Sequence, residues 1–140
     1  MILVDSSVWI DFFNANPTPQ ALWLRQNLDG VTILVGDLIL SEVLQGCRST
    51  REFNLALSLM SMLPTVTVAG REVAIAAARN YRALREQGIT NRRTIDGLIA
   101  TRCIVDDLQL LHDDRDFDPF ARHLGLQVVP SDRPRHPGLT

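Results

Sequence analysis

Short apolar runs alternate along the whole chain with longer segments that carry apolar residues at helical spacing. The first run, Ile2-Leu3-Val4, has no polar residue and is typical of a strand buried on both faces of a sheet. Comparable runs, several of them rich in β-branched residues, follow at residues 31–35, 65–68, 108–112 and 126–129. The pattern therefore predicts five short strands spread over the chain.

The segments between these runs have the periodicity and the end signals of helices. We expect helices over the following stretches: residues 8–13, preceded by Ser6 or Ser7 as the cap, and residues 21–28, 38–45, 49–62, 71–87, 94–104 and 118–124. Gly46 and Gly88 follow two of them at the position where glycine commonly ends a helix, and Ser49 with Glu52 forms a capping-box pattern. Strands that alternate with helices predict an α/β fold of three layers, in which helices cover both faces of a parallel sheet of about five strands.

The composition narrows the class of protein. A chain of 140 residues with 46% hydrophobic residues is ordinary for one globular domain, which we place at residues 1–130, with a flexible tail at 131–140. No apolar run approaches the roughly 20 residues of a membrane span, and the first residues lack the basic start of a signal peptide. The two cysteines, Cys47 and Cys103, look like buried thiols, so the sequence predicts a cytoplasmic protein without membrane contact.

The charge balance gives no overall attraction to nucleic acid, because the formal net charge is −2 at pH 7. All 14 basic residues are arginine. Any phosphate contact would therefore be made by guanidinium groups, which bind oxygen atoms in pairs.

Acidic side chains gather at one edge of the predicted sheet. A helix that connects two parallel strands starts at the edge formed by the carboxyl ends of the strands, where open α/β sheets usually carry their sites. Acids from four separated segments fall at this edge: Asp5 after the first strand, Glu42 in the helix after the second, Asp96 in the first turn of the helix before the fourth, and Asp113, Asp114 and Asp116 after the fourth.

Each acid also has a purely structural explanation. Asp5 can cap a helix, Asp96 can interact with a helix dipole, and Asp114 and Asp116 can cap a loop. Glu42 is harder to explain in this way, because it lies in an otherwise apolar helix and needs a partner if it is buried. Clustered carboxylates repel one another and are stable at neutral pH only when some are protonated or a cation lies between them. Oxygen ligands without His or Cys suit Mg²⁺ or Mn²⁺, which can hold phosphate oxygens and activate water.

The sequence leaves open the roles of two residues next to these acids, His112 and Asp113. His112 could act as a general base or pack at the sheet edge, and the second interpretation is the more common one for a histidine that ends a buried strand. Asp113 is interpreted as a solvated neighbour of the acids and not as a ligand.

Four segments resemble the PIN domain, and more narrowly the VapC toxins of bacterial type II toxin–antitoxin systems. They are Val-Asp-Ser-Ser-Val-Trp-Ile at residues 4–10, Ser-Glu-Val-Leu-Gln-Gly at 41–46, Ile-Asp-Gly-Leu-Ile-Ala at 95–100 and Leu-Leu-His-Asp-Asp-Arg-Asp-Phe at 110–117. Each is weak alone, but all four occur in the order of the family and span nearly the whole chain except the tail.

The resemblance implies a divalent-metal-dependent endoribonuclease that cleaves tRNA or rRNA and inhibits translation. It implies a catalytic and metal-binding set made of Asp5, Glu42, Asp96, Asp114 and Asp116, with Mg²⁺ as the cofactor and Mn²⁺ as a possible substitute. Ser7, at the small polar position that supports the first acid, is a candidate substrate-binding residue, although Ser6 could take its place. The family also implies a homodimer, inhibition by a VapB-type antitoxin, and a larger assembly with it.

Arg92 and Arg93, just before the helix that carries Asp96, are further candidates for contacts with RNA phosphates. A solvated turn is an equally good interpretation of this pair. The sequence does not decide between the two.

Other functions fit less well. A receiver-type signalling module would need a phospho-acceptor Asp after the third strand and a Lys after the last one, but Ala69-Gly70-Arg71 follows the third strand and the chain has no Lys. A P-loop protein would need a Gly-x4-Gly-Lys motif, which is absent from the sequence. A PIN fold that binds partners without catalysis stays open, although the intact set of acids argues against it.

Overall fold

The computed structural model describes residues 1–91 and 93–130, and within them all five predicted strands form one parallel sheet. The strand order is β3-β2-β1-β4-β5. The strands are β1 (Ile2–Val4), β2 (Ile33–Gly36), β3 (Thr65–Val66), β4 (Gln109–Leu111) and β5 (Gln127–Val128). The predicted α/β fold with a five-stranded parallel sheet is therefore confirmed.

The first strand lies at the centre of the sheet. Ile2 of β1 pairs with Ile33 of β2 on one side and with Gln109 of β4 on the other. The chain adds β2 and β3 on one side and then returns past β1 to add β4 and β5 on the other side. The order of the strands therefore reverses between β1 and β4, and the carboxyl edge at such a switch point is where open α/β sheets form binding sites.

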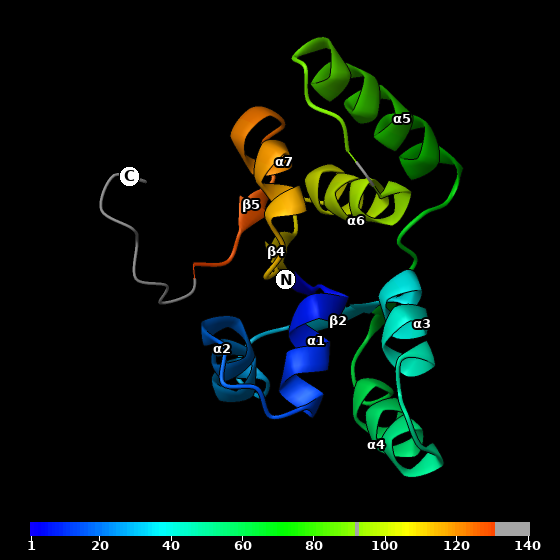
Figure 1. Cartoon of the computed structure of the whole chain (residues 1–140), viewed down its shortest axis with the longest axis vertical. Helices are drawn as coiled ribbons and strands as arrows, with labels where there is room; N and C mark the ends of the chain where they lie inside the picture. Colours follow the sequence, from blue (N-terminus) through cyan, green and yellow to red (C-terminus); the bar gives the residue numbers. More distant parts are fainter. Residues whose placement is uncertain (92, 131–140) are drawn as a thin grey trace.

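Helices cover both faces of this sheet. They are α1 (Ser6–Phe13), α2 (Pro19–Asn27), α3 (Asp37–Gln45), α4 (Thr50–Met60), α5 (Arg71–Glu86), α6 (Thr94–Val105) and α7 (Asp118–His123), with a 3₁₀-helix η1 at Arg115–Phe117. In Figure 1, α1 to α4 lie on one side of the strands and α5 to α7 on the other. Right-handed crossovers explain this division, because the direction in which strands are added changes after β3.

The core consists of the central strands and the helix residues that face them. Leu3, Val4 and Leu110 are completely buried, as are Trp9 of α1 and Phe117 of η1. Trp9 lies in the core, and its ring stacks on Phe13 at 5.8 Å between centroids. The packed centre fixes the turns that leave the carboxyl ends of β1 and β4.

Several boundaries differ from the prediction. β2 begins at Ile33 because Val31 is 40% exposed and lies before the sheet, and β3 has only two residues. α2 begins at Pro19, where the Thr18 hydroxyl accepts a hydrogen bond from the Ala21 amide. The 3₁₀-helix η1 was not predicted. Arg92 and the predicted tail at 131–140 lie outside the described residues, so the domain boundary stays a prediction.

Neither described cysteine forms a disulfide. Cys103 is buried, as predicted, whereas Cys47 is only partly buried. Within residues 1–91 and 93–130, no helix has the length and apolar character needed to cross a membrane.

Candidate metal centre

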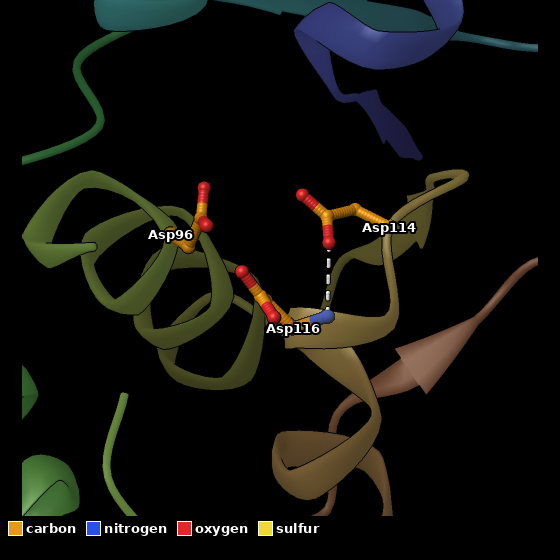
Figure 2. A group of neighbouring side chains, drawn as sticks. All are labelled: Asp96, Asp114 and Asp116. Atoms are coloured by element: carbon orange, nitrogen blue, oxygen red, sulfur yellow. Dashed lines mark hydrogen bonds between the residues drawn. The ribbon is translucent and has the colours of Figure 1, made fainter. Parts of the chain in front are cut away.

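Three of the predicted acids lie together at the carboxyl edge of the sheet. Asp96 belongs to the first turn of α6, and Asp114 and Asp116 belong to the loop and 3₁₀-helix that follow β4. One carboxylate oxygen from each of the three lies within 4.8 Å of the others. Figure 2 shows the three side chains directed toward one another, with the Asp116 amide donating a hydrogen bond to Asp114 Oδ1 at 2.9 Å. We call these residues the acidic trio.

Asp5 lies beside the acidic trio and caps α1. Its Oδ2 accepts hydrogen bonds from the Ser7 amide at 3.1 Å and from the Ser7 hydroxyl at 2.6 Å, and the residue is 4% exposed. Its negative charge raises the pKa of both Asp96 and Glu42. The helix-cap interpretation of Asp5 is therefore correct, and the same carboxylate also acts electrostatically on the other acids.

Ser7 joins the turn after β1 to the loop after β4. Its hydroxyl donates to Asp5 and accepts a hydrogen bond from the Asp113 amide at 3.3 Å. Ser6 has a different partner, because its hydroxyl donates to Glu42 Oε1 at 3.4 Å. Of the two candidate serines, Ser7 is the one that holds Asp5 in place.

Glu42 lies outside the acidic trio and has a cationic partner. Its Oε2 is 3.1 Å from Nη2 of Arg93, and the Glu42 side chain is only 16% exposed. Burial raises the pKa of Glu42 above 4.5 and the charge of Asp5 raises it further, while Arg93 and the Ser6 hydroxyl lower it. The partner that a glutamate in an apolar helix requires is therefore an arginine 51 positions away in the sequence.

Asp96 is the least compensated acid of the site. Its side chain is 4% exposed, and its buried Oδ2 has no hydrogen-bond partner among the described residues. Its pKa is raised from 3.8 to about 6, chiefly by burial. Arg93 opposes the shift, and three nearby carboxylates add to it, those of Asp5, Asp114 and Asp116. A buried carboxylate oxygen without a donor, on a residue grouped with two further carboxylates, fits a hard divalent cation such as Mg²⁺ or Mn²⁺.

The neighbours of the acids hold the loop in shape. His112 Nδ1 accepts a hydrogen bond from the Asp114 amide at 3.2 Å, and its ring centroid lies 4.9 Å from that of Phe117. This arrangement favours the packed edge histidine over the general base.

The sequence did not indicate the pairing of Arg93 with Glu42. The position of Arg93 three residues before Asp96 was the one local signal of a contact with an acid.

A comparison with models of known protein families identifies the family to which the chain belongs. The sequence model of the PIN domain matches residues 2–123. The match covers most of the chain and includes every acid described above. The chain therefore belongs to the PIN-domain family, as predicted, and the receiver-type alternative is excluded.

Within that family the chain is similar to VapC ribonucleases over almost its entire length. It is 34% identical over 131 residues to VapC ribonuclease Mb1587 of Mycobacterium bovis, a match that covers 92% of this chain and 98% of the relative. Ribonuclease VapC11 of Mycobacterium tuberculosis matches with the same identity and coverage. The predicted resemblance to VapC proteins is confirmed.

The fold is also that of solved toxin–antitoxin structures. VapBC2 from Rickettsia felis, bound to a DNA fragment from its promoter, superimposes with a TM-score of 0.67 at 18% identity. The match covers 94% of this chain and 100% of that one. At this identity the likeness supports the fold alone.

The hydrogen bonds of Ser7 predict a stabilising role that Ser6 does not share. Replacement of Ser7 by Ala removes a short bond to a charged acceptor and leaves the Asp113 amide without its acceptor. We expect Ser7→Ala to lower the free energy of unfolding by about 1–3 kcal/mol in urea titrations at pH 7 with EDTA. Ser6→Ala, which loses one 3.4 Å bond, is the matched control and should cost less. Equal losses in the two variants would contradict this role of Ser7.

The raised pKa of Asp96 predicts a pH-dependent stability of the metal-free protein. The folded state binds the proton of the Asp96 carboxyl more tightly than the unfolded state does. The contribution of protonated Asp96 to the free energy of unfolding is therefore complete below about pH 3.8 and is lost as the pH rises through about 6. Asp96→Asn carries no ionisable group at this position, so the variant does not lose this stability as the pH rises. We therefore expect the free energy of unfolding of the variant, measured relative to that of wild type, to rise by about 1–3 kcal/mol from pH 4 to pH 7 in urea titrations with EDTA.

A stability difference between variant and wild type that is the same at pH 4 and pH 7 would contradict the shifted pKa. Saturation with Mn²⁺ provides the internal control. A cation bound by the ionised acids should stabilise wild type at pH 7 and leave Asp96→Asn nearly unchanged.

Proposed function

We propose that this chain is a divalent-cation-dependent endoribonuclease that hydrolyses phosphodiester bonds of tRNA or rRNA, and that it acts as the toxin of a type II toxin–antitoxin system. The observation that carries the proposal is the acidic trio, in which the buried Asp96 Oδ2 lacks a donor among the described residues. Membership of the PIN-domain family and 34% identity to VapC ribonucleases support RNA as the substrate.

The acids of the proposed site have different roles. Asp96, Asp114 and Asp116 would hold the cation, and Asp5, whose charge reaches both Asp96 and Glu42, would complete the set. A divalent cation at such a site polarises the scissile phosphate and lowers the pKa of the attacking water. Mg²⁺ is the expected cofactor, and Mn²⁺ should replace it because both prefer oxygen ligands.

The chain's own residues position the acids for this reaction. Ser7 fixes the Asp5 carboxylate, and the Asp114 carboxylate fixes the start of η1 through the Asp116 amide. Glu42, with its raised pKa, is the group proposed to orient or deprotonate the water. We also propose that Arg93 contacts RNA phosphates, although its guanidinium group pairs with Glu42 in this structure. The same role is proposed for Arg92, which lies outside the described residues.

A partly apolar hollow in the surface is proposed to bind the antitoxin. A hollow of about 480 Å³ lies between α1, α3 and α4, and Ile10, Val43 and Leu55 are among its lining residues. On α4, Leu55 is 65% exposed and Phe53 is 39% exposed. A C-terminal segment of a VapB-type antitoxin would cover these side chains. A homodimer and a larger toxin–antitoxin assembly are proposed from the resemblance to VapC toxins.

Cleavage of total bacterial RNA by the antitoxin-free protein tests this function. We expect discrete fragments with Mg²⁺ or Mn²⁺ and none with EDTA. Asp96→Asn should lose at least about 100-fold in rate, because the lost ligand supplied several kcal/mol of transition-state stabilisation. Asp118→Asn, which removes an exposed carboxylate from the first turn of α7, is the matched control and should keep wild-type activity.

Circular dichroism would confirm that both variants fold. Cleavage that persists in EDTA, or that is equal in wild type and Asp96→Asn, would contradict the proposal. Equal cleavage by wild type and Asp96→Asn would mean that the activity comes from a contaminant or that the acids are structural, and a PIN module that binds partners without catalysis would then be the favoured function.

A further inference from the structure

Arg93 connects two acids that belong to different parts of the site. Its Nη2 lies 3.1 Å from Glu42 Oε2, and its Nε lies 3.9 Å from Asp96 Oδ2. The Arg93 side chain is 53% exposed, whereas those of Glu42 and Asp96 are 16% and 4% exposed. One guanidinium group therefore extends from the solvent into the acidic edge and contacts α3 and α6 at once.

The two contacts of Arg93 are unequal. The bond to Glu42 has hydrogen-bond geometry, whereas Asp96 Oδ2 accepts no hydrogen bond from Arg93 and interacts with it through charge alone. Glu42 is also excluded from the acidic trio. A cation that binds the trio can therefore leave Arg93 in place, but a cation that binds Glu42 Oε2 competes with the guanidinium group for that oxygen.

Among the described residues, Arg93 is the cation that pairs with acids of this site. Arg102 and Arg115 also lie near acids, but neither compensates the site. Arg102 pairs with Asp106 at the far end of α6. Arg115 is exposed and takes part in none of the ion pairs found in residues 1–91 and 93–130. The charge of Arg93 lowers the pKa of both Glu42 and Asp96, as a bound metal ion would.

We propose that Arg93 is a built-in counter-ion that takes the place of a second divalent cation beside Glu42, so that each chain binds one divalent cation, at the acidic trio. This inference rests on the proposed metal-dependent function and specifies its stoichiometry. Removal of the guanidinium charge would leave Glu42 next to Asp5 without a positive partner and open a second cation position there.

Counting bound Mn²⁺ tests the inference. The full-length protein is titrated at pH 7.5, and free Mn²⁺ is measured by electron paramagnetic resonance. We expect one equivalent for wild type and two for Arg93→Gln, a twofold increase. Arg115→Gln is the matched control, since it removes the same charge beside Asp114, and it should keep one equivalent. The double variant Arg93→Gln with Glu42→Gln should return to one.

Two equivalents in wild type, or one in both wild type and Arg93→Gln, would overturn the inference while the metal-dependent function stands. Absence of Mn²⁺ binding in every protein would overturn the proposed function and this inference with it. Arg93→Met keeps the length of the side chain without its charge and should also bind two equivalents. Thermal melting checks that the variants fold. We expect them to fold because the Arg93 side chain is 53% exposed.

Discussion

Mutual repulsion among buried carboxylates is the constraint on which the active edge of this protein depends. Asp96 is almost completely buried, and its pKa of about 6 reflects both lost hydration and the charges of other acids. The fold relieves this repulsion only in part. Ser7 holds Asp5, Arg93 holds Glu42, and the acidic trio is left with a buried oxygen that has no donor in the described chain. The destabilising charge of the metal-free site is the reason we propose that it binds a divalent cation.

The topology brings these charges together. β1 is the central strand, so the residue that follows it faces both the β2 side and the β4 side of the sheet. Asp5 occupies this position and acts on Glu42 from α3 and on Asp96 from α6. The loop after β4, fixed by His112 and capped by Asp114, supplies the remaining acids. A stable core of short parallel strands thus supports an edge whose uncompensated charges lower the stability of the metal-free protein.

The sequence predicted those features that follow from periodicity and from chain direction. The apolar run before Asp5 placed it at the end of a buried strand, and the direction of parallel connections placed Asp96 and Asp114 at the same edge. The prediction did not find η1, because this 3₁₀ turn depends on the Asp114 side chain and carries no periodic signal. It also missed the pair of Arg93 and Glu42, because only the folded sheet brings residues 51 positions apart into contact.

A crystal structure of the antitoxin-free protein soaked in Mn²⁺, with anomalous diffraction data, tests the central claim most directly. We predict an anomalous peak between the carboxylates of Asp96, Asp114 and Asp116 in wild type and its loss in crystals of Asp96→Asn. A well-occupied peak elsewhere, or crystals at saturating Mn²⁺ that show no peak at this edge, would contradict the account of the acids as a metal centre.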